Sequence, residues 1–126
     1  MLLGIGVDIV EIERVERLLD RFGERIARRL LTPREFEQFT ARGAPAGFLA
    51  SRFAAKEATA KALGTGIAQG VGFHGIEVVN SASGQPGLNL QAGAAAWANR
   101  LGVAASHLSL SDEKHYCVAM VVLETA

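Results

Sequence analysis

Asp8 is the first residue whose chemical type does not fit its surroundings. It lies within Leu2–Ile9, an apolar stretch that contains glycines and is too short for a stable helix, so we expect a buried strand. An ionised carboxylate inside such a strand is costly unless it is paired, hydrogen-bonded or bound to a metal ion. Asp8 therefore needs a partner, which is either a neighbouring backbone group that it caps or a functional group elsewhere in the chain.

A second set of charged residues lies on the long helix that we predict for Ala46–Leu63. Lys56 falls within the apolar arc of this helix, Glu57 lies at the edge of the arc, and Lys61 follows Glu57 by one turn. One interpretation is structural: Glu57 and Lys61 form a surface pair worth about 0.3–0.5 kcal/mol, while Arg52 and Lys56 are solvated. The other interpretation is functional, and it depends on Asp8.

Two carboxylates on separate elements, with basic side chains nearby, indicate a site for Mg²⁺ and phosphate. Mg²⁺ takes oxygen ligands, commonly one or two carboxylates together with waters and substrate phosphates. Zinc fits poorly, because the three histidines fall in separate segments and the chain has one cysteine, Cys117. The glycine-rich segment 64–72 is not a P-loop; it is either a connector after the helix or a loop whose backbone N–H groups approach a phosphate.

Two further patterns also have a structural and a functional interpretation. His107, Ser109 and Ser111 share one face of an alternating stretch, which is typical of a solvent-facing stripe and does not resemble a hydrolase site. Arginines recur at steps of three and four residues on the polar face of an early helix, interleaved with acids. Such a face is either solvated or a docking surface for an acidic partner, which its charges would steer into contact. These arginines are Arg14, Arg17, Arg21, Arg25 and Arg28.

The elements that position these residues are predicted from the spacing of apolar residues and from the residues that start and end helices. We expect an amphipathic helix from Ile12 to Ile26 that breaks near Gly23, then a new helix that starts with the capping sequence Thr32-Pro33-Arg34-Glu35. The later segments predict a hairpin, a short helix and two strands, with ranges 73–80 and 87–91, 93–101, 106–111 and 116–123. This order favours an α+β fold with a mainly antiparallel sheet and a long central helix.

Size and charge limit the class of protein. The chain has 126 residues, enough for one domain spanning 1–126, and its balance of 13 basic and 13 acidic residues argues against a nucleic-acid or membrane-surface binder. Eleven of the basic residues nevertheless lie between residues 12 and 61, against seven acids. The longest wholly apolar run, 117–123, is far short of the ~20 residues of a membrane span, and the N-terminus lacks a basic region typical of a signal peptide. With one cysteine, we expect a reducing, cytoplasmic location.

The chain resembles the holo-acyl-carrier-protein synthases, the short type of 4′-phosphopantetheinyl transferase. The resemblance rests on two long signatures and continues through shorter matches in the same order. The signatures are GIGVDIVEI at 4–12 and RFAAKEATAKALGTG at 52–66, and the shorter matches are IEV at 76–78, GQP at 84–86 and HLSLSD at 107–112.

The resemblance implies transfer of 4′-phosphopantetheine from coenzyme A to a serine of an acyl carrier protein for fatty acid biosynthesis, leaving adenosine 3′,5′-bisphosphate. It implies Asp8 and Glu57 as ligands of Mg²⁺. Lys61 is our candidate for the phosphate, and either Glu57 or a metal-bound water activated by Asp8 would take the serine proton. Coenzyme A would lie near Arg52 and His107, with Gly64, Thr65, Gly66 and Pro86 lining the rest of its pocket.

Partners follow from the same resemblance. The helix with Arg14, Arg21, Arg25 and Arg28 would receive the acidic carrier protein, and the chain would form a homotrimer whose sites are shared between subunits. We also expect Lys56, with Arg52 and Lys61, to serve coenzyme A. The alternative from another class is a non-catalytic module that binds an acidic protein through its arginines, although such a module has no need of Asp8 and Glu57.

Overall fold

The computed structural model describes residues 1–126 as a mixed α/β structure with two antiparallel sheets. The elements in chain order are β1 (Leu2–Glu11), α1 (Ile12–Phe22), α2 (Glu24–Leu30), α3 (Pro33–Ala41), α4 (Ala46–Leu63), the short 3₁₀ turn η1 (Phe73–Gly75), β2 (Ile76–Asn80), β3 (Pro86–Leu90), α5 (Ala92–Leu101), β4 (Val103–Asp112) and β5 (Tyr116–Thr125). The predicted α+β class, mainly antiparallel with a long central helix, is confirmed.

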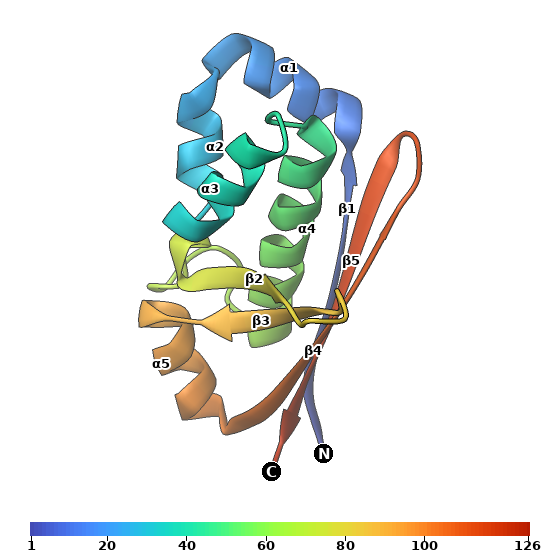
Figure 1. The fold of residues 1–126 in the computed structure, drawn as a ribbon. Helices are drawn as coiled ribbons and strands as arrows, with labels where there is room; N and C mark the ends of the chain where they lie inside the picture. Colours follow the sequence, from blue (N-terminus) through green and yellow to red (C-terminus); the bar gives the residue numbers. More distant parts are fainter.

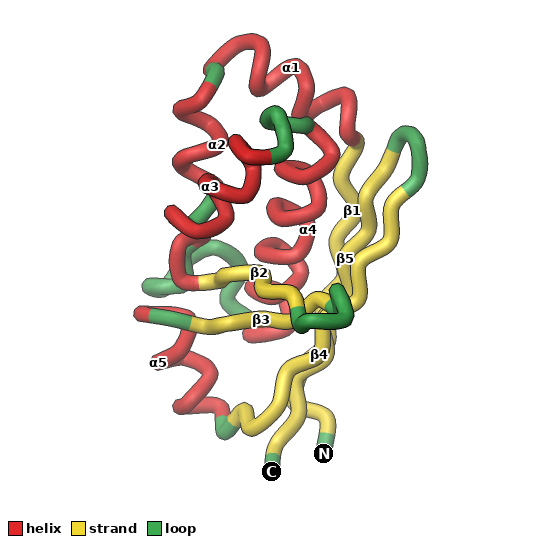
Figure 2. The backbone as a smooth tube through the Cα atoms, viewed as in Figure 1, coloured by secondary structure: helices red, strands yellow, loops and turns green.

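The central helix α4 lies along one face of a three-stranded sheet with the order β1-β5-β4 (Figure 1). Helices α1 to α3 gather beside the N-terminal half of α4, and the β2-β3 hairpin crosses its C-terminal half. Figure 2 shows the same separation, with the helices on one side of the long strands and the two chain termini close together. The core therefore forms around α4. None of the helices is both long and apolar enough to cross a membrane.

Local signals set the ends of the helices as predicted. Gly23, with φ of 60°, separates α1 from α2. Thr32 and Glu35 form both hydrogen bonds of the capping box that starts α3. The helix α4 spans Ala46–Leu63 and ends at Gly64, whose φ of 82° lies in the left-handed region that favours glycine.

The predictions for the strands need two corrections. Leu2–Ile9 and 116–123 were expected to be buried, but each strand of the sheet is buried on one face alone. Ile5, Val7 and Ile9 are 61, 57 and 62% exposed, because their side chains point away from α4, while Gly6 and Val10 on the other face of β1 are buried against it. The predicted strand at 73–80 begins at Ile76, since residues 73–75 form the turn η1, closed by a hydrogen bond from the Gly75 N–H to the Gly72 carbonyl.

Candidate functional site

Close contact between β1 and α4 places Asp8 beside the helix. A Cβ atom on Gly4 would lie 2.0 Å from the carbonyl oxygen of Ala62, and one on Gly6 would lie 1.9 Å from that of Ala58. Neither position has room for a side chain, so the strand and the helix touch backbone to backbone. Side chains alternate along a strand, and Asp8 therefore points to the same face as Gly4 and Gly6.

Lys61 is the partner that the Asp8 carboxylate needed. The ammonium group of Lys61 donates to Asp8 Oδ1 at 3.1 Å and to the carbonyl oxygen of Val7 at 3.0 Å. The Asp8 side chain is 18% exposed and that of Lys61 is 52% exposed, so the pair lies at the edge of the core and reaches solvent. The surface pair between Glu57 and Lys61, which the structural interpretation required, is absent, because Lys61 reaches across to the strand.

Glu57 completes the cluster from the preceding turn of α4. Burial raises the pKa of its carboxyl group, and the negative charge of Asp8 raises this pKa further, while Lys61 and Arg14 lower it. Asp8 and Glu57 therefore lie near enough to repel each other, with two cations close by. Two oxygen donors with partly uncompensated negative charge fit a hard cation such as Mg²⁺, which needs no more than one or two carboxylates. No group of three or more acidic, histidine or cysteine side chains gathers anywhere in the structure, so a cation held by these two carboxylates would take its other ligands from water and substrate.

The glycine-rich segment is fastened to the same part of α4. The N–H groups of Thr65 and Gly66 both donate to the carbonyl of Ala60, at 3.2 and 3.1 Å. The predicted loop residues Gly64, Thr65 and Gly66 thus follow directly from Lys61. Pro86 begins β3, in the hairpin that crosses this half of the helix (Figure 1).

Arg52 lies near the other end of α4, over two turns from Lys61. It is buried, its guanidinium stacks 4.0 Å from the centre of the Phe48 ring, and its Nη1 donates to Ser51 Oγ at 3.0 Å. Its Nε has no hydrogen-bond partner. Burial lowers the pKa of Arg52, and the positive charge of Arg42 lowers it further. The Glu35 charge raises this pKa in part, but no carboxylate forms an ion pair with Arg52, so its guanidinium suits an anion.

A cavity of about 130 Å³ opens beside this guanidinium. Its walls are Ser51, Arg52, Leu110, Ser111 and Asp112, from α4 and the end of β4. Arg42 is the functional candidate that the sequence analysis missed here. Its proximity to Arg52 depends on the turn between α3 and α4, and no local pattern indicates it.

His107 does not join the other predicted residues within one chain. It is opposite Val122 on β5, on the face of the sheet that points away from α4, whereas Leu108 on the next position is buried. Its Nε2 contacts the Glu124 carboxylate. The same face carries the exposed side chains of β1 and Met120, which is 42% exposed.

The predicted docking arginines lie on the exposed surface of α1 and α2. Arg14, Arg21, Arg25 and Arg28 are all exposed, and Arg14 is the one near enough to lower the pKa of Glu57. Arg28 pairs with Glu24, whereas Arg21 stacks 5.1 Å from the Phe22 ring. A cavity of about 220 Å³ lies between Phe22, Arg25, Ile26 and Arg29, so apolar and basic groups share one surface.

The expectation that Lys56 binds coenzyme A together with Arg52 and Lys61 is wrong as far as direct contact goes. Lys56 is 0% exposed, and its ammonium group pairs with Glu35 at 2.6 Å inside the protein. The alternative that Arg52 and Lys56 are solvated is wrong for the same reason, since both are buried. The position of Lys56 within the apolar arc was the signal for a buried lysine, but its partner lies 21 residues away and has no sequence signature.

Comparisons with known proteins cover almost the whole chain. A family model described as the 4′-phosphopantetheinyl transferase superfamily matches residues 4–121. Holo-acyl-carrier-protein synthases from Vibrio cholerae and Photorhabdus laumondii are 55 and 51% identical, each with 98% of both chains covered. The crystal structure of the Neisseria meningitidis synthase matches with a TM-score of 0.94 at 43% identity, covering 99% of this chain and 100% of the other. The Helicobacter pylori synthase in complex with coenzyme A matches with a TM-score of 0.83 at 29% identity, covering 95 and 99%.

Proposed function

The chain belongs to the 4′-phosphopantetheinyl transferase superfamily, and from this membership we propose that it transfers 4′-phosphopantetheine from coenzyme A to a serine of an apo acyl carrier protein. Adenosine 3′,5′-bisphosphate is the other product, and the holo carrier protein serves fatty acid biosynthesis in the cytoplasm. The observation that carries the proposal is the convergence of Asp8, Glu57 and Lys61 where β1 meets α4. A non-catalytic binder of acidic proteins would need the arginines alone.

Asp8 and Glu57 are the residues that would hold Mg²⁺. Burial raises the pKa of Glu57 and the charge of Asp8 raises it further, and a bound cation would offset both effects by stabilising the charged carboxylates. When bound, Mg²⁺ would neutralise charge on the pyrophosphate oxygens of coenzyme A. Arg14, at the edge of the cluster, adds positive charge from the docking helix.

Lys61 would hold the phosphate that is attacked. Two of its three N–H donors are used by Val7 and Asp8, which fix the ammonium group in place and leave the third for a phosphate oxygen. The serine oxygen forms a bond to phosphorus, the bond from phosphorus to the leaving phosphate oxygen breaks, and the serine proton must be taken up. Glu57 and a water beside Asp8 are the two acceptors available there.

The remainder of coenzyme A would extend along α4 in both directions from Lys61. Gly64, Thr65, Gly66 and Pro86 would line the pocket at the C-terminal end of the helix. Arg52, beside Arg42, would bind a phosphate of the adenosine part where it lines the neighbouring cavity.

The carrier protein would dock on α1 and α2. Arg14, Arg21, Arg25 and Arg28 are exposed there, and a strongly acidic partner would be steered to them. Arg14 connects this surface to the cluster, because it lies close enough to influence Glu57. A carrier protein held on α1 would therefore present its serine near Lys61 and Glu57.

A homotrimer would account for the exposed apolar face of the sheet. Ile5, Val7, Ile9 and Met120 form a contiguous set on neighbouring strands, of a kind that marks contacts with other proteins. His107 lies on this face, away from Asp8 in its own chain. A second copy packed here would bring its own His107 toward the coenzyme A that is bound by the first, so the site would be shared between subunits.

Mass spectrometry of the carrier protein tests the proposed function. The protein is incubated with coenzyme A, Mg²⁺ and an apo acyl carrier protein, and we expect the carrier to gain one 4′-phosphopantetheine. The gain should disappear with Glu57→Gln and when Mg²⁺ is chelated, and it should persist with Glu37→Gln, a matched control on the exposed surface of α3. No gain with the wild-type protein, or an undiminished gain with Glu57→Gln, would refute the proposal.

A further inference from the structure

A buried ionic cluster lies on the side of α4 that does not face the proposed metal site. Lys56 Nζ is 2.6 Å from Glu35 Oε1 and donates to the carbonyl oxygen of Phe73 at 2.9 Å. The side chains of Lys56 and Glu35 are both 0% exposed. Lys56 is therefore adjacent to Glu57 in sequence but points into the protein instead of toward substrate.

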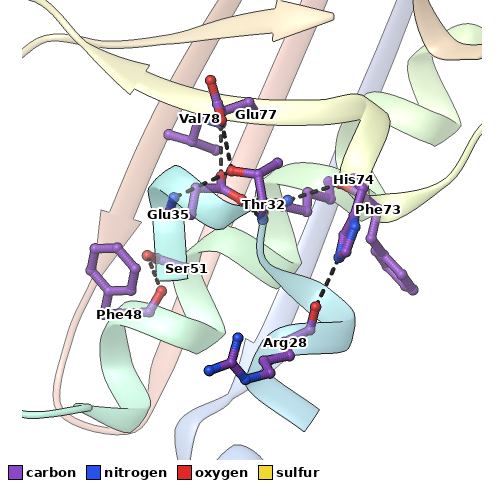
Figure 3. Close-up of polar contacts among 10 residues, drawn as sticks. Arg28, Thr32, Glu35, Phe48, Ser51, Phe73, His74, Glu77 and Val78 are labelled. Carbon is purple, nitrogen blue, oxygen red and sulfur yellow. Dashed lines mark hydrogen bonds and ion pairs between the residues drawn. The ribbon is translucent and has the colours of Figure 1, made fainter. Parts of the chain in front are cut away.

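Glu35 is satisfied on both of its oxygens. Its Oε1 also accepts from the Thr32 N–H at 2.9 Å, and its Oε2 accepts from the Val78 N–H at 2.8 Å. Thr32 Oγ1 in turn donates to Glu77 Oε2 at 2.6 Å. Figure 3 shows Glu35 and Thr32 below Glu77 and Val78 of β2, with Phe73 to the right. The cluster thus links four elements, namely α3, α4, η1 and β2.

A buried ion pair such as Lys56 with Glu35 contributes little net free energy to folding. Removing two charges from water costs about as much as their attraction returns, and well-packed apolar side chains of similar volume often do as well. The pair instead orients the Lys56 ammonium group, which holds the Phe73 carbonyl at one place beside α4. Phe73 also packs its ring 5.9 Å from that of Phe53 on the same helix.

Phe73 is where the glycine-rich segment 64–72 ends. The segment starts with Thr65 and Gly66 bonded to the carbonyl of Ala60, and it returns to Lys56, about one turn of the helix earlier. Both ends are therefore fastened to the turn of α4 that carries Glu57 and Lys61. Within the segment Gln69 and Gly70 adopt positive φ, and Val71 beside them is buried in the core.

We infer that Lys56 is a positioning residue for coenzyme A: through the Phe73 carbonyl it holds segment 64–72 against the turn of α4 that bears Glu57 and Lys61. This inference rests on the proposed function, in which that segment lines the coenzyme pocket. Lys56 touches neither substrate. Its loss should weaken coenzyme A binding while the metal site and the carrier-docking helices stay as they are.

The test uses the double variant Lys56→Met with Glu35→Gln, which removes both charges and keeps an acceptor oxygen at residue 35. We expect the variant to fold, with a cooperative thermal transition. Its KM for coenzyme A should rise about tenfold, which corresponds to the loss of one charge-assisted hydrogen bond. Its kcat and its KM for the carrier protein should stay within about twofold of wild type. The Kd of coenzyme A, measured calorimetrically without carrier protein, should rise by the same factor. Thr59→Val is the matched control, because Thr59 is buried on the same helix but bonds to the Ala55 carbonyl alone.

The role of Lys56 is decided by the KM for coenzyme A in the folded variants. A folded double variant with the wild-type KM for coenzyme A overturns it, as do equal losses for both substrates or a Thr59→Val protein with the same defect. Should the double variant not fold, Glu35→Gln alone is measured: we expect a KM for coenzyme A raised about threefold, and an unchanged KM overturns the inference. A wild-type protein without transfer activity would refute the proposed function itself, so the two failures are distinguishable.

Discussion

Replacing Gly6 by alanine tests whether the backbone contact between β1 and α4 positions the site. The new Cβ would lie 1.9 Å from the Ala58 carbonyl oxygen, whereas ordinary contacts begin at 3.4 Å, so strand and helix must separate by about 1.5 Å. The hydrogen bonds from Lys61 to Val7 and Asp8, now 3.0 and 3.1 Å, would then exceed hydrogen-bonding distance.

Two measurements follow from this displacement. Overpacking of this kind costs about 1–3 kcal/mol, which at about 4 °C per kcal/mol lowers the Tm of Gly6→Ala by about 4–12 °C. A misplacement of about 1 Å costs about 100-fold in rate, so we expect a loss of that order in kcat, measured by mass spectrometry of the carrier protein at a temperature where the variant is folded.

Gly47→Ala is the matched control for this experiment. Gly47 lies in the first turn of the same helix, and a Cβ atom added to it would meet nothing within 4 Å, so alanine should leave activity unchanged and should stabilise the helix by about 0.5–1 kcal/mol. If Gly6→Ala keeps the wild-type Tm and kcat, the contact has more tolerance than its geometry implies. If it loses Tm but keeps kcat, the contact supports the fold without positioning Lys61.

Three further predictions concern charge and surface. Burial and the charge of Asp8 raise the pKa of Glu57, so the contribution of this residue to stability is present below the pKa of an unfolded glutamate and is lost as the pH rises. Glu57→Gln should therefore raise the Tm at pH 7 but not at pH 4. A lower Tm at pH 7 would contradict this prediction. Arg21→Glu with Arg25→Glu should raise the KM for the carrier protein at least tenfold and leave the KM for coenzyme A unchanged, while equal losses would mean that the helices are structural. Val7→Glu should lower the oligomeric mass measured by light scattering, and an unchanged mass would exclude this face as the subunit contact.

Much of the local structure could be predicted because its causes lie within a few residues. The capping box at Thr32 and Glu35, the break at Gly23 and the end of α4 at Gly64 all depend on neighbours in the sequence, and each is confirmed. Asp8 also stood out locally, as a charge in an apolar strand. Its need for compensation was a physical requirement before any partner was known.

The partners themselves were decided by packing. Lys61 was expected beside Glu57, four residues away, but it bonds to Asp8, 53 residues away, because Gly4 and Gly6 let the strand approach the helix. The exposed face of β1 was also not predictable from composition, since Gly4, Gly6 and Asp8 face the helix while Val7 points outward, whereas the solvent-facing stripe of β4 was predicted correctly.

The sequence by itself thus determined which residues carry charge, where the helices begin and end, and which family the chain resembles. The tertiary structure decided which charges meet: Lys56 with Glu35 in the core, Lys61 with Asp8 at the site, and His107 on the opposite face of the sheet. The physical reason is the separation in sequence over which each kind of interaction acts. Capping and periodicity act within about one helical turn, whereas an ion pair joins whatever side chains the packing of distant elements brings within a few ångströms.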